Sequence, residues 1–78
     1  MPWKTCEVTA AGPAENGVIY ISLRATDGSF HHWFNANATY EREMLATALT
    51  AISATKTVWA LLTATSAYST INRLYVRA

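Results

Sequence analysis

Apolar and polar residues alternate along most of this 78-residue chain, a pattern typical of strands with one buried face. The alternation is cleanest at residues 18–25, where Ile19, Ile21 and Leu23 point to one side. Similar runs predict four more strands, at residues 3–10, 29–36, 57–63 and 71–77. Asn-Gly at 16–17 and Asp-Gly at 27–28 favour hairpin turns between the first three strands.

Residues 39–53 follow the period of a helix instead. Apolar side chains recur there at steps of three and four, which gathers them into one stripe. The predicted stripe consists of Tyr40, Met44, Leu45, Ala48, Leu49 and Ile52. Asn37 or Thr39 is expected to cap the first turn, while Glu41 and Glu43 place negative charge at the positive end of the helix dipole.

The predicted order of elements is therefore β-β-β-α-β-β. Five short strands with a helix after the third is the connectivity of the OB-fold, a Greek-key barrel. We expect a mainly β fold of this class, with residues 1–78 as a single domain and the helix capping the barrel. The alternative is an α+β sandwich with the helix across an open sheet. Trp59 is expected to be covered, and Leu74 and Val76 to point inward.

The composition indicates self-association. Charged residues make up only 14% of the chain, whereas an ordinary soluble domain has about 25%. Cys6 is the single cysteine, so no intrachain disulfide can support a core of this size, and no cysteines and histidines have zinc-ligand spacing. Because such small chains usually need additional support, we expect a homo-oligomer that uses neither a metal nor another cofactor.

The charge pattern disfavours two other classes of partner. The net charge is +1 and the six lysines and arginines are spread along the chain, whereas nucleic-acid binding usually requires a dense basic face. The longest unbroken apolar run, residues 58–62, is far too short to cross a membrane. The opening residues lead directly into the first predicted strand, so we expect no signal peptide in this chain.

The residues with reactive side chains do not form a catalytic pattern. His31 and His32 are neighbours on a strand, so they point to opposite faces and cannot readily chelate one metal ion. Cys6 has no base placed beside it and is expected to be an inert, apolar residue. Asp27 is expected to serve its hairpin turn. We therefore expect no catalytic residues and no enzymatic activity.

Several short features occur together in residues 28–77. Gly28 precedes a strand with Phe30 and the pair Phe34-Asn35, a helix rich in Leu and Ala follows, and the chain ends with a Thr-Val strand start at 57–58 and the strand RLYVR. In these features the chain resembles the receptor-binding B subunits of AB5 toxins, and most of all the Shiga-type B subunit.

The resemblance implies a secreted, homopentameric ring of OB-folds. In that family the helices line a central pore, edge strands of neighbouring subunits pair, and one face carries shallow glycan sites. The chain departs from the family at three places. Cys6 alone cannot form the family's disulfide, residues 36–39 are additional, and Ala54-Thr55 stand where the family places a glycine.

The aromatic residues are the best candidates for binding. If Phe30 and Phe34 enter the core, Trp33 points outward, where its ring can stack on the apolar face of a sugar. The hydrogen bonds to such a glycan would come from His31, Asn35 and Asp27. Alternatively, Trp33 belongs to a subunit contact or to the core. The residues predicted for the oligomer interface are Met44, Thr47, Trp59, Leu61, Arg73 and Tyr75.

Three functions are compatible with these patterns. The first is a non-enzymatic, pentameric module that binds cell-surface glycans. The second is a single-stranded nucleic-acid binder that stacks bases on aromatic side chains. The third is a ring with only a structural role, including that of an engineered scaffold.

Overall fold

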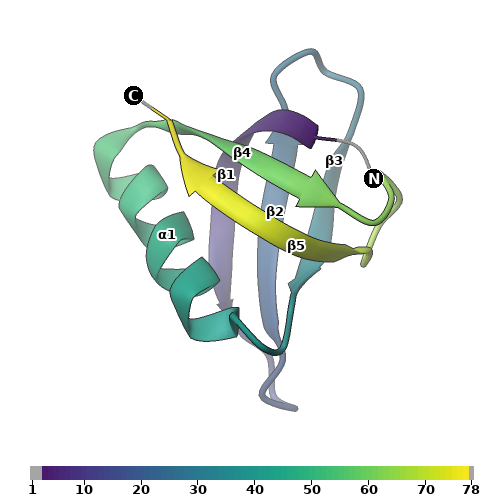
Figure 1. Ribbon diagram of the computed structural model, residues 1–78, viewed down its shortest axis with the longest axis vertical. Coiled ribbons are helices and arrows are strands. Elements are labelled where there is room, and N and C mark those ends of the chain that lie inside the picture. Colours follow the sequence, from purple (N-terminus) through teal and green to yellow (C-terminus); the bar gives the residue numbers. More distant parts are fainter. Residues whose placement is uncertain (1–2, 78) are drawn as a thin grey trace.

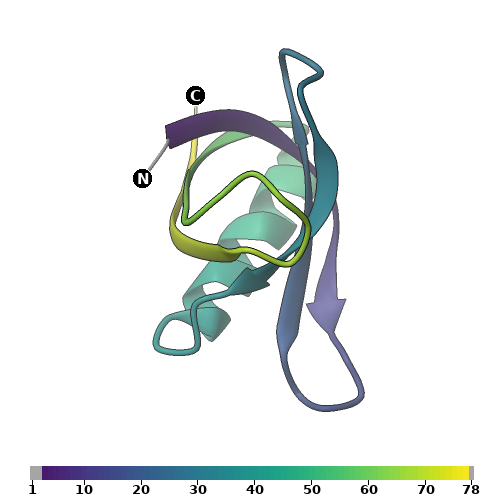
Figure 2. The ribbon, with the colours of Figure 1, turned by 90° about the vertical axis from the view of Figure 1, so that its right-hand side faces the viewer.

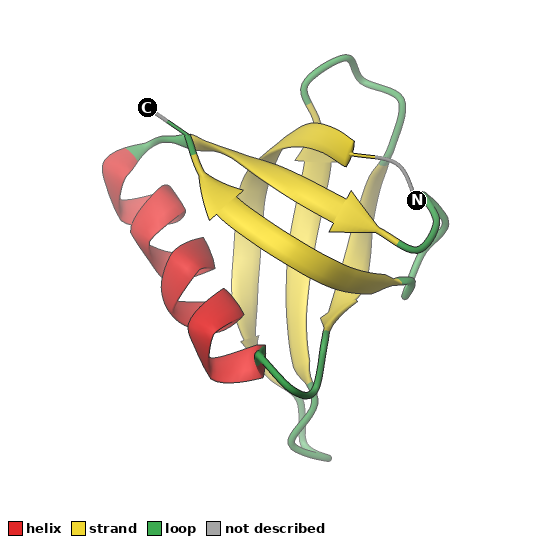
Figure 3. Ribbon diagram, viewed as in Figure 1, coloured by secondary structure: helices red, strands yellow, loops and turns green. Residues whose placement is uncertain are grey.

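The computed structural model describes residues 3–77, and its elements follow the predicted order (Figures 1 and 3). The elements are β1 (Trp3–Pro13), β2 (Ile19–Ala25), β3 (His31–Ala36), α1 (Glu41–Ala54), β4 (Thr57–Leu62) and β5 (Thr70–Val76). The strands form a closed barrel in the order β1-β2-β3-β5-β4. This is the arrangement of the OB-fold, so the predicted fold class is confirmed.

Strand β1 closes the barrel. Residues 3–7 of β1 pair with β4, whereas residues 6–13 pair with β2. The open sheet considered as an alternative is therefore wrong. The register with β2 shifts between Val8 and Ala10, which marks a β-bulge. Beyond the bulge the strand continues to Pro13, three residues past its predicted end at residue 10.

The remaining seam of the barrel is short. Strands β3 and β5 run parallel, with Asn35 opposite Thr70 and Ala36 opposite Ile71. Helix α1 lies along the barrel beside β1 and β5 (Figure 1). Figure 2 shows β2 and β3 as one wall of the barrel, with the loop between β4 and β5 in front.

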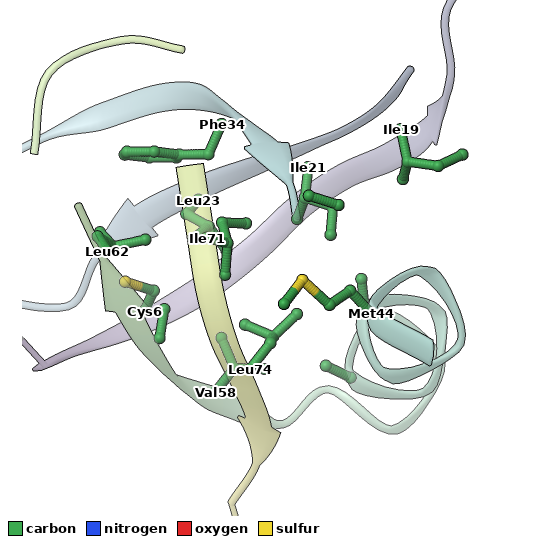
Figure 4. Close-up of a cluster of buried hydrophobic side chains, with 14 of the residues drawn as sticks. Cys6, Ile19, Ile21, Leu23, Phe34, Met44, Val58, Leu62, Ile71 and Leu74 are labelled. Carbon is green, nitrogen blue, oxygen red and sulfur yellow. The ribbon is translucent and has the colours of Figure 1, made fainter. Parts of the chain in front are cut away.

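The core fills the barrel and the space under the helix (Figure 4). Ile19, Ile21 and Leu23 are buried on one side of β2, as the alternation predicts, and Phe34 is the largest fully buried side chain. The other buried apolar residues are Cys6, Ala25, Phe30, Ala36, Met44, Ala48, Ala51, Val58, Ala60, Leu62, Ile71 and Leu74.

The helix buries only part of the predicted stripe. Met44, Ala48 and Ala51 face the barrel, and Leu45 packs at their edge. The predicted stripe is wrong at Tyr40, Leu49 and Ile52, which are exposed. The apolar residues of α1 span a wider arc than the barrel can cover, and so part of the stripe remains at the surface.

Two residues of the last strands are more exposed than expected. Trp59 is 46% exposed rather than covered by its own chain. Val76 is the register partner of the buried Val58 and so lies on the inner side, as predicted, although it is 37% exposed. Leu74 is buried, as predicted. The inner sides of β4 and β5 face the barrel core, whereas no described element packs over their outer sides, where Trp59 lies.

The start of α1 differs from the prediction. Tyr40 precedes the helix and provides no side-chain cap, so the caps predicted at Asn37 or Thr39 are wrong. The side-chain oxygen of Asn37 instead accepts a hydrogen bond from the Thr39 N–H at 2.9 Å. Glu41 and Glu43 do lie in the first turn, as predicted, where they favour the helix dipole.

Thr55 ends the helix in a left-handed conformation, with φ 56°. Its N–H donates to the carbonyl of Ile52 at 3.3 Å, and the N–H of Lys56 donates to that of Ala51 at 2.9 Å. These two bonds form a Schellman motif, in which the left-handed position usually holds glycine because a β-branched side chain is strained there.

We predict that Thr55→Gly raises the free energy of unfolding by about 1 kcal/mol, because glycine adopts the left-handed conformation without steric cost. Urea denaturation measures the change. Ala54→Gly is the matched control. It lies one residue earlier, inside the helix, and is expected to lower stability because glycine disfavours helical backbone. A destabilised Thr55→Gly protein would contradict the prediction.

A second prediction concerns Cys6, a fully buried free thiol. Its burial, and to a lesser extent the charge of Asp27, raise the pKa of Cys6 from 9.0 to about 11, against the opposing effect of Lys4. Since the folded pKa exceeds the unfolded one, this contribution to stability is present below pH 9 and is lost as the pH rises towards 11.

The free energy of unfolding should therefore fall more steeply between pH 9 and 11 in the wild type than in Cys6→Ala. Denaturant titrations at several pH values give the two slopes. Comparing the two slopes cancels the loss of stability that the smaller alanine side chain causes equally at every pH. Parallel slopes would show that ionisation of Cys6 does not oppose folding.

Candidate functional site

Strand β3 presents three of the predicted glycan-binding residues on one face. Phe34 is buried on its inner side, while His31, Trp33 and Asn35 alternate with it and lie on the outer side. Trp33 is 42% exposed. The prediction that Trp33 points outward is therefore confirmed, and it does not belong to the core of this chain.

Trp33 borders a cavity of about 450 Å³ on this outer face. Its aromatic wall consists of Tyr20 from β2, Trp33 from β3 and Tyr68 from the β4–β5 loop. Tyr20 and Tyr68 meet edge to face, with their ring centroids 5.7 Å apart. Small residues of β1 and the following loop complete the lining: Ala10, Ala11, Gly12, Pro13 and Ala14. We call this the aromatic cavity.

Tyr68 is held over β3 by backbone interactions. Its N–H donates to the carbonyl of Trp33 at 2.6 Å, and its own carbonyl accepts from Asn35 Nδ2 at 3.1 Å. The N–H of Asn35 also donates to the carbonyl of Ser69 at 2.9 Å. Tyr68 has φ 63°, a conformation that is unfavourable for an aromatic residue. The structure thus holds a strained residue at the cavity, as is common at binding sites.

Asn35 carries an unused acceptor beside the cavity. Its side-chain N–H donates to Tyr68, but its Oδ1 atom is buried and accepts no hydrogen bond from any described residue. A buried acceptor without a partner costs about 1–3 kcal/mol.

A cluster of polar side chains adjoins the aromatic cavity. The Thr9 hydroxyl donates to Ser22 Oγ at 2.7 Å, and Thr9 Oγ1 lies 3.2 Å from His31 Nε2. With its proton directed at Ser22, the Thr9 oxygen can accept from the His31 ring N–H. Ser22 is the register partner of Trp33, so hydroxyl and imidazole groups stand next to the stacking surface.

Asp27, the fourth residue predicted to bind a glycan, does not line the aromatic cavity. Its carboxylate accepts a hydrogen bond from the Ser29 N–H at 2.9 Å, and bonds to Ser29 lower its pKa. Asp27 instead serves its hairpin turn, which was the other role expected for it.

The second cluster of exposed aromatic residues lies on the outer side of β1, β4 and β5, which we call the β1–β4–β5 face. Trp3 stacks on Tyr75 with centroids 5.8 Å apart, and the Arg77 guanidinium lies 4.6 Å from the Trp59 ring centroid. A smaller cavity of about 370 Å³ is lined by Trp3, Lys4, Thr5, Trp59 and Tyr75.

The structure brings most of the predicted interface residues together. Trp59 and Tyr75 are register partners, as are Leu61 and Arg73. Thr47 of α1 lines a groove together with Arg73 and Tyr75, so the helix and the β1–β4–β5 face adjoin.

Met44 is the exception among the predicted interface residues. It is only 4% exposed because it points from α1 into the core of its own chain (Figure 4). The prediction of Met44 as an interface residue is therefore wrong.

Of the residues that line the aromatic cavity, only Trp33 was predicted, and the most important of the others are Tyr20, Gly12 and Tyr68. Tyr20 lies on the outward face of the cleanest predicted strand, and Gly12 lies beyond the predicted end of the first strand at residue 10. Tyr68 is a single aromatic residue in a loop of small residues, a signal that points to a role for its ring. The proximity of Tyr68 to Trp33 depends on the path of the β4–β5 loop, which no local pattern predicts. Tyr20 and Gly12 are instead placed by the pairing of β2 with β3 and with β1.

No group of three or more metal-ligating side chains occurs among residues 3–77. Helix α1, with 14 residues, is not long and apolar enough to cross a membrane, and the same holds for any helix among residues 3–77. No family model, curated protein or solved structure matches the chain.

Proposed function

We propose that this protein is a non-enzymatic carbohydrate-binding module whose aromatic cavity takes a neutral sugar. The observation that carries the proposal is the placement of Tyr20, Trp33 and Tyr68 around one cavity. The cavity lies over β2, β3 and the loops that follow β1 and β4. In OB-folds this is the region that binds oligosaccharides and oligonucleotides.

The lack of charge in the cavity favours a sugar over a nucleic acid. None of the eight residues that line it is charged, whereas a single-stranded nucleic acid needs cations along its phosphates. The C–H face of a pyranose can pack on an aromatic ring, and its hydroxyls can bond to polar neighbours. His31 and Thr9 supply such neighbours on the same face.

We further propose that the protein self-associates, as the resemblance to the B subunits of AB5 toxins implies. Two exposed apolar surfaces support this part of the proposal. One is the β1–β4–β5 face with Trp59 and Tyr75, and the other is the outer side of α1 with Leu49 and Ile52. Contiguous exposed apolar surface on a soluble domain usually marks an interface. A homopentamer is the assembly that the resemblance favours.

A screen on a glycan array, followed by calorimetric titration of the best ligand, tests the proposed binding. We predict that Trp33→Ala weakens the affinity at least tenfold, because the ring that packs on the sugar is lost. Trp3→Ala removes an equally exposed tryptophan from the β1–β4–β5 face and is expected to leave the affinity unchanged.

Two results would contradict the proposed binding. The first is an array on which no glycan binds. The second is salt-sensitive binding of an oligonucleotide that Trp33→Ala abolishes, which would favour the nucleic-acid alternative. Binding of neither ligand by a stable ring would leave the structural role as the better description.

Light scattering on a sizing column, in reducing buffer, tests self-association. We predict a mass near five times the 8.6 kDa of one chain. Trp59→Glu should lower this mass because it places a charge in the centre of the β1–β4–β5 face. Trp33→Ala, on the other side of the barrel, should not. A monomeric wild-type protein would contradict the proposal for assembly while leaving the proposal for sugar binding intact.

A further inference from the structure

We infer that Gly12 determines which sugars the aromatic cavity accepts, by leaving the backbone of β1 open as a flat floor for the ligand. The inference rests on the proposed carbohydrate-binding function and extends it to a class of ligand. The sugars expected to bind are pyranosides with at least one face made only of C–H groups.

The backbone of β1 does not itself require glycine at this position. Gly12 lies within β1, and its φ is not in the left-handed region, unlike those of Gly17 and Gly28. Any residue can therefore adopt its conformation. Glycine inside a strand lowers stability, because it loses more conformational freedom on folding and packs no side chain.

The space above Gly12 belongs to the cavity. Gly12 is the register partner of Tyr20, so both lie on the same side of the sheet, and both line the cavity. A Cβ atom placed on Gly12 would meet no atom within 4 Å. The Tyr20 ring therefore does not cover this glycine, and a side chain added here would enter the space left for the ligand.

The chemistry of the floor restricts the ligand. Beside Gly12 the floor consists of alanine and proline residues, so it offers no polar side chain to a hydroxyl that points down at it. An axial hydroxyl directed at this floor would lose its water without a compensating side-chain hydrogen bond. A face of C–H groups has no hydrogen bonds to water to lose, so it can lie directly on the strand.

Three glycosides of similar size distinguish ligands by this criterion. Methyl β-glucopyranoside has two uninterrupted C–H faces, and methyl β-galactopyranoside has one, because its hydroxyl at C4 is axial. In methyl α-mannopyranoside the axial oxygens at C1 and C2 interrupt both faces. We expect the wild-type protein to bind the first two at least tenfold more tightly than the third, in titrations followed by NMR.

Variants of Gly12 test its role directly. Gly12→Ala is expected to weaken binding of the two β-glycosides several-fold, and Gly12→Val to abolish it, because their side chains occupy the floor. Both variants should keep or raise the thermal unfolding midpoint, because residues with a side chain suit a strand better than glycine. Thr5→Val, in the other half of β1, is the control and should not change binding.

Loss of binding with undiminished stability is a result that a merely structural glycine would not give. If Gly12→Val lowers the unfolding midpoint, the affinity of Gly12→Ala for the two β-glycosides tests the inference instead. Undiminished affinity in a stable Gly12 variant, or equal wild-type affinity for all three glycosides, would overturn the inference while the proposed function stands. A wild-type protein that binds no glycan would instead overturn the proposed function.

Discussion

The structure depends on one strand that belongs to both halves of the barrel. Cys6 lies where β1 passes from one partner strand to the other, and it is the register partner of Ala25 in β2 and of Val58 in β4. All three side chains are small and buried. Small residues let three strands curve tightly around this point, which is how a sheet of five short strands closes without an exposed edge.

The bulge in β1 connects the closure of the barrel to the site. Before the bulge, Cys6 and Val8 face the core, and after it Ala11 packs against the core while Gly12 lies on the outer side with Tyr20. The extra residue, Thr9, joins the hydroxyl cluster with Ser22. One strand thus supplies core residues in its first half and the floor of the aromatic cavity in its second.

The sequence predicts the barrel well because its inner positions alternate regularly, as in Ile19, Ile21 and Leu23. It predicts the helix but only part of its buried face, since apolar residues occur over too wide an arc to choose among them. Trp33 is identified by alternation alone. Gly12 and Tyr68 are not, because a bulge and a long-range loop contact bring them to Trp33. Tyr20 lies beside Trp33 through the pairing of β2 with β3.

The two aromatic clusters occupy different sets of strands, and this separation matters for a shallow site. The aromatic cavity uses β2, β3 and the second half of β1, whereas the other cluster uses β4, β5 and the first half. An assembly through the β1–β4–β5 face would therefore leave every cavity open. A single open cavity of this size gains little affinity from one sugar, but several on one ring would bind a dense glycan surface together, and the effective concentration of the later sites would raise the overall affinity. Self-association and sugar recognition then reinforce each other, and neither needs the charge or the disulfide that this chain lacks.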